Sequence, residues 1–153
     1  EEESNGFELD LAGEITPNWS ILASYAYIDA RITKTASNSE KDFDMQRPST
    51  PRHSGNIWTK YIISEGPLKH LGFGAGYNFV TERYGQVGRR ANTTVYPGYG
   101  LVNAVLYYKI NQIQLQANLN NILNKTHWVG GYDKLRSFPG APRNVNISIS
   151  YKF

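Results

Sequence analysis

The chain has 153 residues and no cysteine, with 16 Lys and Arg against 13 Asp and Glu for a formal net charge of +3. The absence of cysteine excludes a disulfide framework, a thiolate nucleophile and a cysteine-based metal site, and the small, scattered positive excess gives no support for a nucleic-acid partner. No apolar run approaches the roughly 18 residues of a transmembrane helix. The mean hydropathy of −0.50 is an average, so it does not reveal an alternation of apolar and polar residues along the chain.

The chain begins Glu1-Glu2-Glu3-Ser4, without an initiator methionine and without the basic and apolar regions of a signal peptide. We therefore expect either that processing removed such a segment or that the chain is a piece of a longer protein.

Apolar and polar residues alternate with period two in seven segments, as in half-buried β-strands. These segments cover about residues 7–14, 19–31, 55–63, 71–79, 100–110, 112–120 and 145–153. A helical period would mix Gln with Leu on every face of residues 112–120. The sequence therefore predicts an all-β, antiparallel, up-and-down chain.

Short and long connections between these segments alternate along the chain. Short turns are expected at residues 16–18, around 66–67 and at 111, and long polar connections at about 32–54, 82–98 and 125–142. Outer-membrane barrels have short periplasmic turns and long extracellular loops, and a tilted strand of about 10 residues crosses a bilayer. This architecture accounts for three long loops at one end.

The composition of the two faces bears on which of them meets lipid. The polar face is mostly Gly, Ser, Asn and Gln, whereas a soluble exterior is usually rich in Lys and Glu. Aromatic residues near strand ends suggest interfacial girdles: Trp19, Tyr27, Tyr61, Tyr99, Tyr151 and Phe153. We predict that the apolar face meets lipid, while a soluble lipocalin-like barrel with that face turned inward around a ligand stays open.

An odd number of strands does not close a bacterial barrel, since such single-chain barrels have even numbers. An open sheet would also leave two unpaired edges in lipid. The seven segments are therefore interpreted as the last part of a larger barrel.

Six stretches, in this order and spacing, resemble a known family: residues 6–10, 16–20, 23–30, 51–61, 119–125 and 140–144, followed by an alternating strand that ends in Phe153. They are similar to the C-terminal barrel of TonB-dependent siderophore receptors. The resemblance extends over the whole chain, and its subclass is that of receptors for ferric hydroxamates and related siderophores.

The resemblance implies a bacterial outer-membrane barrel of about 22 strands, with residues 1–153 as its final seven and with the plug domain and TonB box absent from this chain. The receptor would import iron(III) as a siderophore chelate, driven by TonB-ExbB-ExbD, among outer-membrane lipids and lipopolysaccharide. It would be no enzyme and would bind no cofactor itself. The last strand would carry the signal for the barrel assembly machinery: Val145, Ile147, Ile149, Tyr151 and Phe153.

Siderophore contacts in this family come from aromatic and Arg side chains, which suit an apolar complex with oxygen atoms around iron. Trp128 and Tyr132 in the last long loop are the first candidates, and Tyr84 and Arg90 the second. The alternatives are loop packing for the aromatic residues and lipopolysaccharide phosphates as the ligand of Arg90.

The sequence gives no support for catalysis or for a metal site. His53, His70 and His127 lie in or beside different connections, without a metal-ligand spacing, and no Gly-x-Ser-x-Gly motif occurs. A passive porin remains the alternative among outer-membrane barrels.

Overall fold

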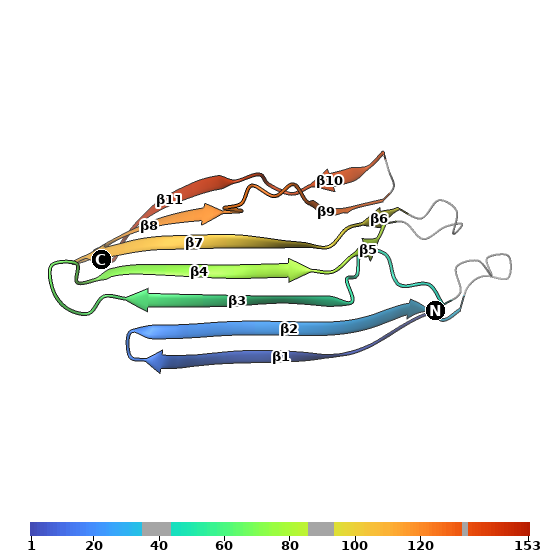
Figure 1. Cartoon of the computed structure of the whole chain (residues 1–153), viewed down its shortest axis with the longest axis horizontal. Helices are drawn as coiled ribbons and strands as arrows, with labels where there is room; N and C mark the ends of the chain where they lie inside the picture. The colour runs from blue at the N-terminus through green and yellow to red at the C-terminus, as the bar shows by residue number, and fades with distance from the viewer. Residues whose placement is uncertain (35–43, 86–93, 133–134) are drawn as a thin grey trace.

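Seven long strands lie side by side in one antiparallel sheet, in the order β1-β2-β3-β4-β7-β8-β11 (Figure 1). The structure is a computed structural model that describes residues 1–34, 44–85, 94–132 and 135–153. The strands are β1 (Glu2–Thr16), β2 (Trp19–Ile32), β3 (His53–Ile62), β4 (Leu71–Val80), β7 (Tyr99–Ile110), β8 (Ile113–Asn120) and β11 (Asn144–Tyr151). All seven predicted segments are confirmed as strands, and each pairs with the next of the seven.

Three short turns and three long connections alternate between these strands, as predicted. The turns lie at the end of the sheet where the C-terminus is, and the N-terminus lies at the opposite end with the long connections (Figure 1). Left-handed backbone at Gly66 (φ 79°), His70 (φ 71°) and Asn111 (φ 51°) closes two of the turns. Gly and Asn adopt this conformation more readily than other residues, which explains two of these three positions.

Two small hairpins within the long connections were not predicted. The first pairs β5 (Arg83–Tyr84) with β6 (Val95–Tyr96), and the second pairs β9 (Trp128–Gly131) with β10 (Ser137–Pro139). Strands of two to four residues are too short to show alternation. Their pairing depends on tertiary contacts that no local pattern encodes.

The sheet has an apolar face that nothing in the described chain covers. Phe7 is 59% exposed, Val145 57% and Ile147 76%, while the hydrophobic residues that are buried among the described ones are Ala30 and Tyr96 alone. A lipocalin-like barrel would enclose Val145 and Ile147 in its interior. The structure instead presents a continuous apolar surface, larger than a protein in water normally leaves exposed.

The polar face is lined in part by glycines of β4 on which aromatic rings lie. Register places Gly72 opposite Tyr107 and Gly76 opposite Trp58, and a β-carbon on either glycine would overlap that ring. The alternating glycines therefore let two large rings lie flat across β4.

One aromatic residue is on the face opposite to the predicted one. Tyr99 pairs with Val80, so it shares the polar face with Asn103 and Tyr107. The prediction that Tyr99 belongs to an interfacial girdle is therefore wrong. Tyr99 is three residues from Val102, so the two side chains lie on opposite faces of the strand, and this spacing could already be seen in the sequence.

The described part of the chain contains no helix with the length and apolar character needed to span a membrane.

Candidate ligand-binding loops

The β5–β6 and β9–β10 hairpins contact each other at the end of the sheet that carries the long connections (Figure 1). The Arg83 guanidinium donates a hydrogen bond to the carbonyl oxygen of Trp128. The Tyr96 hydroxyl lies 3.0 Å from the Ser137 hydroxyl oxygen. These contacts join two loops that are far apart in the sequence into one unit.

Arg83 is a buried cation, only 4% exposed. Its Cζ lies 5.4 Å from the ring centroid of Tyr99, and the Tyr99 ring lies 4.5 Å from that of His127. No described carboxylate lies within ion-pair distance of Arg83. The aromatic face and the Trp128 carbonyl are therefore its stabilising partners, through a cation–π contact and a charge-assisted hydrogen bond.

Trp128 begins strand β9, Tyr132 directly follows its last residue, and both are accessible to a ligand. Trp128 is 36% exposed and Tyr132 is 59% exposed. The Tyr132 ring meets Phe138 edge-on at 6.1 Å, and Arg136 Cζ lies 5.5 Å from the Tyr132 ring centroid. One hairpin thus presents apolar rings and a cation together.

Tyr84 does not share a pocket with Trp128 and Tyr132. It borders an open groove of about 620 Å³ that is lined by Asp44, Met45, Gln46, Arg52, His53, Thr81, Glu82, Tyr84 and Val95. Neither Trp128 nor Tyr132 lines this groove, so the structure does not bring Tyr84 into one pocket with them. The fourth candidate, Arg90, lies outside the described residues.

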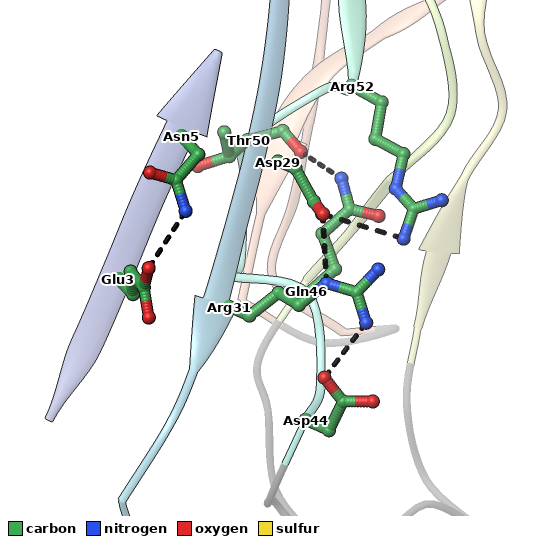
Figure 2. Close-up of polar contacts among 8 residues, drawn as sticks. All are labelled: Glu3, Asn5, Asp29, Arg31, Asp44, Gln46, Thr50 and Arg52. Atoms are coloured by element: carbon green, nitrogen blue, oxygen red, sulfur yellow. Dashed lines mark hydrogen bonds and ion pairs between the residues drawn. The ribbon is translucent and has the colours of Figure 1, made fainter.

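Figure 2 shows a charged cluster beside this groove, where residues 44–47 run along the end of β2. Arg31 Nε lies 3.0 Å from an Asp29 carboxylate oxygen, and Arg31 Nη1 lies 2.8 Å from one of Asp44. Arg52 reaches the same Asp29 at 3.7 Å. Arg31 lies beyond the roughly 10 residues of β2 that would cross a bilayer. The hydrogen bonds that its guanidinium donates to the Asp29 and Asp44 carboxylates raise its pKa. The cluster holds the first long connection against β2.

Two buried polar side chains also hold the last long connection, and sequence reasoning missed both. Asn121, 3% exposed, donates through Nδ2 to the carbonyl oxygens of Lys125 at 2.9 Å and Ala141 at 3.1 Å, and its Oδ1 accepts from the Lys125 amide. The ring of His127, 7% exposed, lies against Gly140. A single sequence does not distinguish such Asn and His residues from exposed ones.

Within the described ranges, no three His, Asp or Glu side chains gather in a way that could hold a metal ion. His53 instead shares a hydrogen bond of 2.7 Å with the Tyr25 hydroxyl through Nδ1.

Comparison with known proteins places the chain. A family model described as TonB dependent receptor-like, beta-barrel, matches residues 1–122. The chain is 32% identical over 162 residues to the probable TonB-dependent siderophore receptor PiuA of Acinetobacter baumannii, with 100% of the chain and 21% of PiuA covered. It is 30% identical over 158 residues to the metal-pseudopaline receptor CntO of Pseudomonas aeruginosa, again over 100% of the chain and 21% of the relative. The ferrioxamine B receptor of Salmonella typhimurium is 29% identical over 156 residues, with 99% of the chain and 21% of the receptor covered.

The fold agrees with these sequence matches. The crystal structure of PiuA superimposes with a TM-score of 0.81 at 30% identity, over 99% of this chain and 22% of the PiuA chain. The chain thus spans about a fifth of the length of the curated relatives it matches. It belongs to the TonB-dependent receptor β-barrel family, whose members are outer-membrane proteins, and its apolar and polar faces match the lipid-facing and lumen-facing surfaces of such barrels.

Proposed function

We propose that this chain forms part of the barrel wall and outward-facing loops of a receptor that imports an iron(III)–siderophore complex of the hydroxamate type, energised by TonB. The observation that carries the proposal is the exposed pair Trp128 and Tyr132 on one hairpin of a chain of this family. Iron(III) is cargo here and reaches the protein already chelated.

Residues 1–153 would be the C-terminal segment of the barrel, with the plug domain and TonB box elsewhere in the protein. TonB-ExbB-ExbD would act through those parts. The apolar residues of β11 (Val145, Ile147, Ile149 and Tyr151), together with Phe153, would form the signal for the assembly machinery, and lipopolysaccharide would surround the outer ends of the strands. The exposure of these side chains supports a surface role for them.

The chemistry of the hairpin supports the proposed ligand class. A ferric hydroxamate combines apolar chain with oxygen atoms around the metal, and Trp and Tyr each combine apolar area with one hydrogen-bonding group. Tyr84 and Arg90 would make second contacts, the cation toward an anionic edge of the complex. The relatives named above are receptors for different ligands, pseudopaline and ferrioxamine B. A comparison of ligand classes is therefore part of the test.

The test is equilibrium binding of ferric siderophores to the full-length receptor in detergent, with a hydroxamate and a catecholate complex compared. We expect the hydroxamate to bind more tightly. Trp128→Ala and Tyr132→Ala should each weaken that binding about tenfold, the effect of losing ~1.4 kcal/mol. Leu68→Ala, at an exposed position in the turn before β4 at the opposite end, is the matched control and should bind as the wild type does.

Two outcomes would count against the proposal in different ways. Tighter binding of the catecholate would overturn the hydroxamate class alone. Unchanged affinity in both hairpin variants, with the barrel assembled normally, would remove Trp128 and Tyr132 from the ligand site.

A further inference from the structure

The open groove of about 620 Å³ described above lies on the apolar side of the sheet and not on the lumen side. His53, which lines it, pairs with Tyr27 of β2, and Tyr27 pairs with Phe7 on the apolar face of β1. Directly paired residues of neighbouring strands share a face. Gln46 also lies on this face, because it bridges to Arg31, four residues beyond Tyr27. We call this groove the outer groove, and the side chains that give it its character are Asp44, Met45, Gln46, Arg52, His53 and Glu82.

The outer groove begins where the apolar face ends. The rings of Phe7, Tyr27 and His53 form a row, with neighbouring centroids 5.9 Å and 5.1 Å apart. Beyond this row, the next residues of β2 on the same face are the charged residues Asp29 and Arg31. Aromatic residues of outer-membrane barrels gather at the boundary between the hydrocarbon core and the headgroups. The outer groove therefore lies at the level of the lipid headgroups, at the end that carries the long connections.

The charges of the outer groove do not favour a simple anion as its ligand. Arg52 lies 3.7 Å from an oxygen of Asp29, and Asp44 lies 2.8 Å from Arg31 (Figure 2). Glu82, which is exposed, has no ion-pair partner among the described residues. The groove thus contains an arginine that is already paired and a carboxylate that is not, so a phosphate group would find no excess of positive charge there.

The remaining groups of the outer groove both donate and accept hydrogen bonds. The Gln46 amide donates through Nε2 to the carbonyl oxygen of Thr50 at 2.7 Å, which leaves its oxygen as an acceptor. The Arg52 guanidinium carries five N–H donors, more than one carboxylate uses, and Glu82 supplies acceptors alone. Met45 adds apolar surface. A sugar matches this set, because each hydroxyl both donates and accepts while the ring carries apolar C–H groups.

We propose that the outer groove binds the saccharide headgroup of a glycolipid in the outer leaflet of the membrane. Sugar hydroxyls would donate to Glu82 and accept from Arg52, and ring C–H groups would contact Met45. The volume lies within the roughly 300–1,000 Å³ of small-molecule sites. Continuity with the apolar face favours a lipid as the source of the sugar, since acyl chains of the same molecule would lie along Phe7 and Tyr27. The inference rests on the proposed place of the chain among outer-membrane lipids, but not on the siderophore.

Binding of purified lipopolysaccharide to the full-length receptor, delipidated in a mild detergent and followed by native mass spectrometry, tests the proposal. The comparison ligands are the oligosaccharide released from it, which has no acyl chains, and phosphatidylethanolamine, which has no sugar. We expect saturable binding of lipopolysaccharide, binding of both comparison ligands that is weaker by more than about tenfold, and no displacement by inorganic phosphate. Displacement by phosphate, equal binding of either comparison ligand, or no saturable binding of lipopolysaccharide would overturn the proposal.

Two variants locate the binding in the outer groove. Glu82→Ala should weaken the binding of lipopolysaccharide about tenfold, because a hydrogen bond to a charged group is lost. The same change at Glu65, in an exposed turn at the opposite end, is the matched control. Val95→Trp, which fills the groove from a position that is 49% exposed, should abolish saturable binding. Tighter binding by Glu82→Ala would indicate a phosphate in place of a sugar, and unchanged affinity in both variants would place the lipid elsewhere, so either result overturns the proposal.

Siderophore binding is measured on the same variants as an independent readout. Tyr84 also borders the outer groove, but it is left unchanged because it is a proposed siderophore contact. Glu82→Ala should keep the siderophore affinity and the unfolding midpoint of the wild type while its lipopolysaccharide binding falls. Failure of the siderophore proposal would appear in the Trp128 and Tyr132 variants, and is therefore distinguishable from failure of this one.

Discussion

The guanidinium of Arg83 donates a hydrogen bond to the backbone carbonyl of Trp128, and so a buried cation in one loop holds a proposed ligand residue in another. Arg83 directly precedes Tyr84, which is one of the second-choice candidates for a ligand contact. The two hairpins therefore form one scaffold, in which the position of Trp128 depends on a side chain that itself has almost no access to ligand.

Replacing Arg83 should loosen the β9–β10 hairpin without unfolding the sheet. We expect Arg83→Met to lower the local stability of residues 128–131 by about 1.5–3 kcal/mol, the contribution of a hydrogen bond to a charged group. Hydrogen exchange of these amides in the full-length receptor measures the change. Arg143→Met, at an exposed position before β11, is the control. Equal protection of the hairpin in both variants would show that Arg83 does not hold it.

The glycines of β4 give a second prediction, which concerns packing on the lumen face. Gly76→Ala should destabilise the barrel by about 1–3 kcal/mol, because the added methyl group overlaps the Trp58 ring. Gly13→Ala, where a β-carbon meets no atom within 4 Å, should leave stability nearly unchanged. Denaturant unfolding in detergent compares the two. If Gly76→Ala is as stable as Gly13→Ala, the ring does not lie where the structure has it. Shortening Trp58 to Ala should relieve the clash.

Adjacent residues of β11 test which face meets lipid. Ile147 is 76% exposed on the apolar face near the middle of the strand, and Ser148 points to the opposite face. Ile147→Arg should destabilise the membrane-inserted receptor by about 2–4 kcal/mol, the penalty for a cation near the bilayer midplane. Ser148→Arg should be tolerated, because its side chain enters the wet lumen. Folding into lipid vesicles across a urea series measures the loss of folding free energy for each variant. A larger loss for Ser148→Arg than for Ile147→Arg would show that the polar face, and not the apolar one, meets lipid.

Phe153 gives a prediction about assembly as opposed to stability. Phe153 lies beyond the last strand, is fully exposed and packs edge-on against Tyr151 with ring centroids 5.1 Å apart. If this end is the assembly signal, Phe153→Ala should reduce the amount of receptor inserted in cells several-fold while its unfolding midpoint in detergent changes little. Insertion at the wild-type level would remove Phe153 from the signal.

The long strands could be predicted because each carries a period-two pattern over at least eight residues. The same pattern restricts the register, since a slip of one residue would move Val145 and Ile147 to the polar face. The prediction for Tyr99 was wrong because it considered only that the residue lies near a strand end, and not which face of the strand its side chain occupies. The small hairpins could not be predicted, because β5 and β6 have two residues each.

The four candidate contacts were chosen from residue type, and their contact with a ligand stays a prediction. Trp128 and Tyr132 stand exposed on one hairpin, while Tyr84 borders a different groove. The residues that hold these loops, Arg83 and Asn121, were missed because burial of a polar side chain is a property of the folded chain. The sequence shows which polar side chains are present, but the contacts made on folding decide which of these side chains are buried.

Uptake of radiolabelled iron, supplied as a ferric hydroxamate to cells that carry the full-length receptor, distinguishes TonB-driven import from passive diffusion. We expect saturable uptake that disappears when TonB is inactivated and falls in the Trp128→Ala and Tyr132→Ala variants. Uptake that rises linearly with concentration and continues without TonB would contradict it, since that is the behaviour of a passive porin.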